Sequence, residues 1–141
     1  MKKINYVSVL ILGLLVASCA GKSDDPSTQD PSSDVRDNFV AYWSVNEISS
    51  LTGPNSHTVN IVKSTTNSTE ILLNNFSGLS VSARASVDNG NLLTIPYQQL
   101  GSIGFTQGTG TLTGATNISF NYTNTIGASP ADACSAVYTK Q

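Results

Sequence analysis

The chain has 141 residues, of which 11% are charged, and its formal net charge at pH 7 is -2. A chain of this length has room for one domain with a real hydrophobic core, but not for two. Its seven Lys and Arg residues form no basic stripe, which argues against a nucleic-acid partner.

The first 18 residues have the order of a secretory signal peptide. Two lysines follow Met1, residues 7–16 are almost entirely apolar, and Ala17 and Ser18 are small. The apolar core is too short for a membrane-spanning helix, which needs about 20 residues. We therefore interpret residues 1–18 as a signal peptide.

The segment Leu15 to Cys19, LVASC, resembles the lipobox of bacterial lipoproteins. In that family the cysteine becomes the first mature residue and its sulfur carries diacylglycerol. The resemblance implies that Cys19 is lipidated and binds membrane lipid without spanning the membrane. Ala20 stands where some lipoproteins carry an inner-membrane retention Asp, so the expected location is the outer membrane. Ser23-Asp24-Asp25 resembles the export signal of Bacteroidota lipoproteins, which implies a site facing outward.

Residues 19–37 are expected to form the lipidated cysteine and a disordered acidic tether. Residues 20–37 are rich in Gly, Ser, Asp, Pro, Thr and Gln, and almost none is apolar. Such a segment cannot bury enough surface to offset its chain entropy. The folded domain is therefore expected to span residues 38–141.

The domain reads as short β-strands, because apolar side chains recur at every second position. In residues 39–45, Phe39, Ala41, Trp43 and Val45 share one face, which we assign to the interior. Residues 79–87 alternate without a fault, and Asn89-Gly90 after them is a strong hairpin signal. The other expected strands span residues 58–63, 70–76, 92–95, 102–107, 110–115, 117–123 and 133–139.

Three residues have specific expected places in this strand pattern. Pro96 is expected to end regular pairing, because proline has no N–H to donate. Gly108 is expected to form a tight turn between residues 102–107 and 110–115. Tyr122 is expected to point inward together with Ile118 and Phe120.

The predicted fold class is all-β, an antiparallel meander of about seven to eight strands. Such a meander closes into a small lipocalin-like barrel or folds into a two-sheet sandwich, since open edges invite aggregation. An eight-stranded barrel has an interior that is filled by side chains or holds one small ligand. We expect a monomer.

The segments RDNFVAYWSVNE, EILLNNFSGL and CSAVYTKQ resemble small Bacteroidota lipoproteins. Ala41-Tyr42-Trp43 is similar to the Gly-x-Trp signature of lipocalins, with Ala in place of Gly. In lipocalins a late Arg packs on that Trp, and here only Lys140 could take its place. Relatives often carry an early Cys that could pair with the last-strand Cys, so the resemblance makes Cys134 half of a lost disulfide.

The sequence contains few candidate residues for catalysis or metal binding. Cys134 is expected to be a buried free thiol, because Cys19 carries the lipid and small apolar residues surround Cys134. His57 is expected to be a surface turn residue, and Glu47 and Glu70 to be exposed carboxylates at strand ends. No His or Cys pair has zinc spacing. We expect no cofactor, no metal and no enzymatic activity.

The sequence therefore predicts a membrane-anchored cell-envelope lipoprotein that binds a small or extended ligand without catalysis. Trp43 and Tyr122 are the candidate residues, either as ligand contacts or as packing at the barrel base. The alternative is a structural or adhesive surface module without a small-molecule site.

Overall fold

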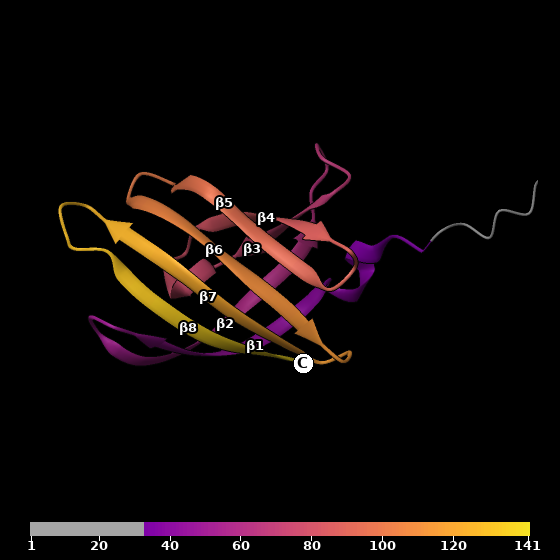
Figure 1. Ribbon diagram of the computed structural model, residues 1–141, viewed down its shortest axis with the longest axis horizontal. Helices are drawn as coiled ribbons and strands as arrows, with labels where there is room; N and C mark the ends of the chain where they lie inside the picture. Colours follow the sequence, from indigo (N-terminus) through magenta and orange to yellow (C-terminus); the bar gives the residue numbers. More distant parts are fainter. Residues whose placement is uncertain (1–32) are drawn as a thin grey trace, which may run out of the picture. The chain divides into compact units, whose positions relative to one another are not determined.

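The computed structural model describes residues 33–141. These residues form a closed barrel of eight antiparallel strands that follow one another in chain order (Figure 1). No helix among the described residues is long and apolar enough to span a membrane. The predicted signal peptide, the predicted lipid site at Cys19 and most of the predicted tether lie outside the described residues. The elements are η1 (Val35–Asn38), β1 (Ala41–Ser49), β2 (Gly53–Lys63), β3 (Glu70–Asn74), η2 (Phe76–Gly78), β4 (Ser82–Asp88), β5 (Leu92–Leu100), β6 (Gly104–Thr113), β7 (Asn117–Ile126) and β8 (Asp132–Lys140).

Closure of the barrel comes from pairing between the first and last strands. Each strand pairs with its neighbour in sequence, and β1 also pairs with β8, so that Trp43 lies opposite Lys140. Closure removes the unpaired strand edges that an open meander would expose. The predicted barrel is confirmed, and the two-sheet alternative is wrong.

The alternation predicted for the first strand is confirmed and extends further than expected. Trp43 and Val45 point inward and are buried, whereas Tyr42 and Ser44 are exposed. The same inward parity continues along β1 to Glu47 and Ser49, both of which are also buried. The predicted hairpin between β4 and β5 is confirmed as well, because Asn89 and Gly90 have φ angles of 51° and 77°.

The predicted turn at Gly108 is wrong, because β6 runs through it as one strand. Gly108 and Gly110 lie opposite Tyr122 and Phe120 of β7. A Cβ atom at Gly110 would lie 2.4 Å from Cε1 of Phe120. Gly110 therefore leaves room for the Phe120 ring, and Gly108 allows the backbone of β7 to approach closely at Tyr122.

Two further boundaries differ from the prediction. The fourth strand begins at Ser82, and residues 75–81 form a connection that contains η2. The fifth strand does not end at Pro96 but continues to Leu100, with a shift of register between Ile95 and Gln98. Proline cannot donate a ladder hydrogen bond, and the sheet accommodates it at this bulge.

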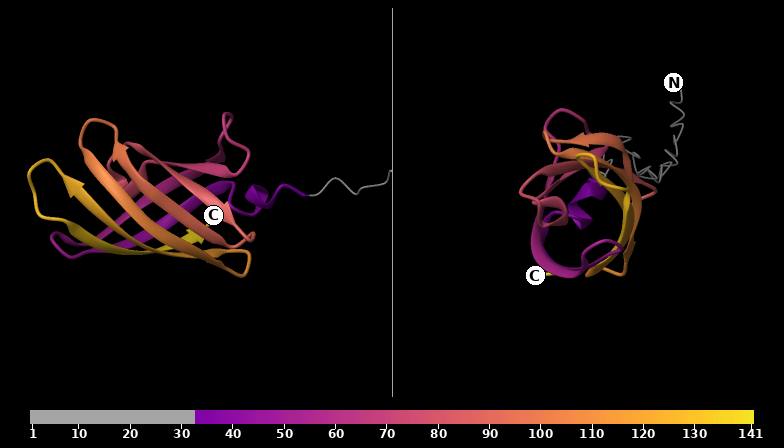
Figure 2. Two further views of the ribbon diagram at one scale, coloured as in Figure 1. Left: turned by 45° about the horizontal axis from the view of Figure 1, so that its top comes forward. Right: turned by 90° about the vertical axis from the view of Figure 1, so that its left-hand side faces the viewer.

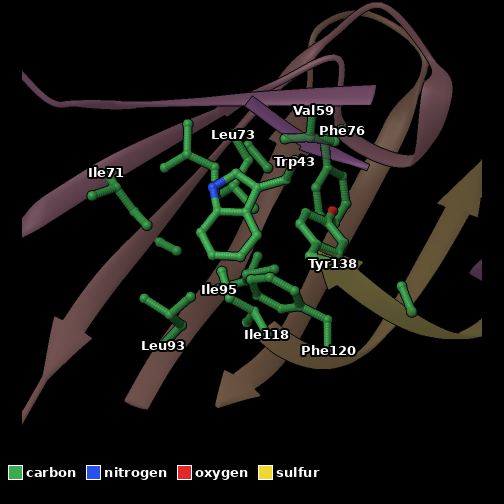
Figure 3. Packing of buried hydrophobic residues seen from close by; sticks show 14 of the residues in the cluster. Trp43, Val59, Ile71, Leu73, Phe76, Leu93, Ile95, Ile118, Phe120 and Tyr138 are labelled. Atoms are coloured by element: carbon green, nitrogen blue, oxygen red, sulfur yellow. The ribbon is translucent and has the colours of Figure 1, made fainter. Parts of the chain in front are cut away.

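The hydrophobic core is built around Trp43, which is fully buried. Figure 3 shows its indole among aliphatic and aromatic side chains from several strands, including Ile71, Leu93 and Phe120. The indole Nε1 donates a hydrogen bond to the Phe39 carbonyl at 2.8 Å, which satisfies its one polar group. The ammonium of Lys140 lies 5.6 Å from the ring centroid, in the place the lipocalin resemblance assigned to it.

The segment before β1 attaches to the loop between β2 and β3. The Arg36 guanidinium donates to Asp34 at 2.7 Å and to the carbonyls of Ser64 and Asn67 at 3.2 and 3.0 Å. Lys63 adds an ion pair with Asp34 at 3.1 Å. These contacts attach η1 to the barrel, and η1 is visible within the barrel outline in an end-on view (Figure 2).

Replacing Trp43 by Ala should lower the free energy of unfolding by about 3–5 kcal/mol, the usual cost of emptying a large aromatic site. Urea denaturation followed by circular dichroism measures this change. The matched control is Tyr42→Ala, one residue away on the exposed face, which should change stability by about 0.5 kcal/mol or less. Equal losses in the two variants would contradict the inward placement of Trp43.

Replacing Gly110 by Ala should destabilise the barrel by about 1–3 kcal/mol, because the new methyl group overpacks the Phe120 ring. Thermal unfolding compared with Thr111→Ala, an exposed neighbour on the same strand, measures the effect. A Gly110→Ala variant as stable as wild type would show that the strand spacing at β6–β7 does not depend on glycine.

Candidate functional site

The most unusual group inside the barrel is the carboxyl of Glu47. Glu47 is only 4% exposed, although sequence reasoning placed it on the surface at a strand end. It takes the inward position that follows Trp43 and Val45 on β1 and lies opposite Ala136 of β8. A carboxyl so removed from water needs hydrogen bonds or a counter-charge to offset its desolvation. The expectation of an exposed Glu47 is therefore wrong.

Hydroxyl groups from two other elements donate to this carboxyl. Ser77 of η2 donates to Oε1 at 2.9 Å, and the Tyr122 hydroxyl of β7 donates to Oε2. Asn124, also on β7, donates through its amide to the Ser77 hydroxyl at 3.2 Å. These four side chains, together with His57 and Tyr138, are called the Glu47 cluster below.

Three polar atoms of the Glu47 cluster are buried without a hydrogen-bond partner. They are Oδ1 of Asn124, the hydroxyl of Tyr138 and Nε2 of His57. Asn124 is 2% exposed and Tyr138 is fully buried. An unsatisfied buried polar group costs about 1–3 kcal/mol, so three such atoms among the described residues call for an explanation.

No arginine or lysine among residues 33–141 neutralises Glu47. Arg36 and Lys63 bind Asp34 near η1, and Arg84 lies 3.9 Å from Glu70. Lys140 lies over Trp43 and donates to the Asn38 carbonyl at 3.1 Å. The cations in the described part of the chain are thus all engaged elsewhere.

The surrounding groups titrate under the combined influence of burial and this carboxyl. Burial raises the pKa of the Tyr138 hydroxyl, and the charge of Glu47 raises it further. Burial is also the main cause that raises the pKa of the Tyr122 hydroxyl above its ordinary value. Burial lowers the pKa of His57, which the Glu47 charge partly opposes. The two tyrosines are therefore neutral hydrogen-bonding groups at physiological pH.

The connection between β3 and β4, residues 75–81, covers the Glu47 cluster. Phe76 is fully buried, and its ring centroid lies 4.7 Å from that of Tyr122. Asn75, Ser77 and Ser80 all have positive φ angles, of 64°, 54° and 56°. Left-handed backbone at residues other than glycine is uncommon and persists where surrounding contacts enforce it.

Side-chain and backbone hydrogen bonds hold this connection in place. Asn75 donates to the Thr58 carbonyl at 2.8 Å and accepts from the Ser80 amide at 2.9 Å. The Phe76 amide donates to the Val81 carbonyl at 2.8 Å. The bonds from Asn75 to Thr58 and from Ser77 to Glu47 tie this connection to β2 and β1, so residues 75–81 lie as one small unit over the cluster.

The two predicted candidates, Trp43 and Tyr122, lie at different levels of the barrel. On β8, Trp43 pairs with Lys140, whereas Tyr122 pairs with Cys134 six residues away. Trp43 belongs to the apolar packing near η1, and Tyr122 belongs to the Glu47 cluster.

Glu70 begins β3 at the end of the barrel away from Glu47, so the structure does not bring these two acids together. The predicted lipid site at Cys19 lies outside the described residues.

Sequence reasoning missed Glu47, His57, Ser77 and Asn124. Strand parity contained the signal for three of them. Glu47 shares the parity of Trp43, and His57 that of Val59 and Ile61. Asn124 shares the parity of Tyr122. His57 is not a turn residue, because it lies within β2 and pairs with Val45. No periodic signal marks Ser77, since it belongs to an irregular connection.

Metal binding finds no support in the described residues. No group of three or more His, Cys, Asp or Glu side chains lies close enough to hold a metal ion within residues 33–141. The Glu47 cluster offers one carboxyl and hydroxyl, amide and imidazole groups, which is a hydrogen-bonding set.

Comparisons with known proteins support the fold. No family model matches the chain, and no curated protein matches it. Among solved structures, the chain is similar to the redesigned β-barrel b11L5F_LGL, with TM-score 0.56, 11% identity and coverage of 77% of this chain and 96% of that one. It is also similar to EF1p2_mFAP2b bound to DFHBI (TM-score 0.56, 12% identity, 77% and 98% coverage).

A third similar structure is the redesigned β-barrel mFAP1 bound to DFHBI, with TM-score 0.53 and 16% identity, covering 77% of this chain and all of that one. At these identities the likeness shows the fold alone. The protein is therefore a small eight-stranded antiparallel β-barrel, similar in fold to these designed barrels.

Cys134, which is buried and free as predicted, should react slowly with thiol reagents. Burial, with a further contribution from the Glu47 charge, raises the pKa of its thiol to about 12. Since the thiolate is the reactive form, a disulfide-exchange reagent at pH 8 should label the native protein slowly and the denatured protein completely. Rapid labelling of the native protein would contradict this burial.

Proposed function

We propose that the protein is a lipid-anchored envelope module that binds a small molecule inside the barrel without catalysis. The observation that carries the proposal is the Glu47 cluster: a buried carboxyl beside three buried polar atoms that have no partner. A ligand seated among these groups would supply the missing hydrogen bonds.

The cost of unsatisfied polar groups also supports a binding role for the Glu47 cluster. Unsatisfied buried polar groups destabilise a fold, and a core packed with apolar side chains would avoid that cost. Departures from such packing are characteristic of functional sites. The apolar half of the barrel around Trp43 provides stability, so the polar half is available for recognition.

The similar barrels add an argument from architecture. Two of them are described as bound to DFHBI, so a barrel of this strand number and connectivity accommodates a small molecule. The present interior is filled by Phe76 and Ser77 of the β3–β4 connection, and binding would require this segment to move.

Anchoring rests on the sequence alone. The LVASC segment and the charged and apolar residues before it are the features of a lipoprotein leader. Lipid on Cys19, followed by the acidic segment, would hold the barrel at an outer-membrane surface.

A screen of neutral and charged fragments against the full chain, followed by NMR, tests the binding proposal. Bound fragments should shift the resonances of Ser77, Tyr122 and Asn124. Tyr138→Phe should weaken binding by up to about tenfold, because it removes an unpartnered hydroxyl that a ligand would bind and one hydrogen bond contributes about 0.5–1.5 kcal/mol. The control Tyr97→Ala, on the outer face, should leave binding unchanged. Fragments that shift only outer-face resonances would overturn the proposal.

Lipidation is tested by mass spectrometry of the N-terminal peptide from native membranes. The expected product is an acylated peptide that begins at Cys19, and Cys19→Ser should move the protein to the soluble fraction. An unmodified cysteine in membrane-derived protein would contradict the anchor.

A second candidate function, an adhesive surface module, has one observation in its favour. Tyr97 and Phe105 are exposed on neighbouring strands and stack with a centroid distance of 5.2 Å and an interplanar angle of 3°. Flat exposed aromatic pairs are suited to contact with another surface. Loss of cell-surface adhesion in Tyr97→Ala, without loss of interior ligand binding, would favour this function.

A further inference from the structure

We infer that the Glu47 cluster selects a small organic cation, a primary ammonium group carried on a short apolar body. This inference rests on the proposed function, because it names the ligand class of the same site. It is argued from the charge of the cluster, from its hydrogen-bonding groups and from the residues that now fill the space.

Within the described residues, Glu47 has no counter-ion. Glu47 is buried, and Arg36, Lys63, Arg84 and Lys140, the cations of the described barrel, all lie at other sites. Interactions between charges are stronger in a low-dielectric interior than in water. A cation that reaches Glu47 would therefore complete an ion pair that the chain itself leaves unfinished.

The hydrogen-bonding groups point to the same ligand. A primary ammonium group has three N–H donors and no acceptor. The Glu47 carboxyl, Oδ1 of Asn124 and the hydroxyl of Tyr138 can each accept a hydrogen bond, and the last two now have no partner. An anionic ligand would meet an unpaired carboxyl, and an apolar ligand would leave the same atoms unsatisfied.

The present occupant of the cluster suggests how the ligand enters. The Ser77 hydroxyl donates to Glu47, where the proposed ammonium would donate, and the Phe76 ring packs against Tyr122. Movement of residues 75–81 would free both positions at once. The apolar space left by Phe76 would receive the body of the ligand.

Backbone conformation makes this segment the natural one to move. Asn75, Ser77 and Ser80 hold left-handed φ angles, a backbone conformation that is strained for residues other than glycine. Displacement would release part of this strain, which would offset the loss of the contacts made by Phe76. Residues 75–81 would thus act as a cover that the ligand replaces.

The test compares n-butylammonium with n-butanol, a neutral probe of similar size, by NMR titration of the full chain in detergent micelles at pH 7. Butylammonium should give saturable shifts at Ser77 and at the Asn124 side-chain amide. Its affinity should exceed that of butanol by about tenfold or more, as one added charged hydrogen bond would give. Equal affinity of the two probes in the wild-type protein would overturn the inference without needing any variant.

Glu47→Gln provides the second arm, since it keeps the shape and removes the charge. It should abolish most of the preference for butylammonium over butanol. The matched control is Asp132→Asn, a carboxylate that binds Ser49, Ser50 and the Leu51 amide outside the cluster and should keep the preference. A preference that survives Glu47→Gln would overturn the inference.

The outcomes separate this inference from the proposed function. If neutral fragments bind at Ser77 and Asn124 as well as butylammonium does, the site stands and the ligand class is wrong. If no fragment of any charge shifts these residues, the proposed interior site itself fails, and the inference fails with it.

Discussion

The pairing of β1 with β8 is the constraint on which the rest of the structure depends. Closure turns one face of every strand toward a common interior, so each inward side chain must find its partners among the other inward side chains. This explains why Trp43 is fully buried. It also explains why Glu47, four residues later on the same inward face of β1, is buried. A carboxyl at that position cannot reach water sideways through the sheet.

The interior is divided along the barrel into an apolar and a polar half. Near η1, Phe39 and Trp43 form a packed base, and Arg36 and Lys63 attach the preceding segment beside it. Toward the β1–β2 connection, the Glu47 cluster replaces apolar packing. The first half provides the stability of a small domain, and the second provides chemical groups that apolar packing would not require.

Strand periodicity predicted most of the fold, because a closed barrel leaves each strand with one buried face. It correctly gave the barrel, the hairpin at Asn89-Gly90 and the inward placement of Trp43. It failed at Gly108, since a glycine needed for close packing against Tyr122 has the same signature as a turn glycine. It also failed at residues 75–81. Leu79 and Val81 continue the alternation of β4 toward the N-terminus, so the predicted strand began at residue 79, before the true start of β4 at Ser82.

The sequence predicted only part of the Glu47 cluster. Tyr122 was assigned inward, but Glu47 was placed at the surface because charged residues are rarely buried alone. Only the parity of β1 could have indicated that Glu47 points inward.

A crystal structure of the protein with n-butylammonium tests the account most directly. It should place the ammonium nitrogen within hydrogen-bond distance of a Glu47 oxygen, with residues 75–81 displaced. A cation bound only on the outer face, above an unchanged β3–β4 connection, would contradict the account.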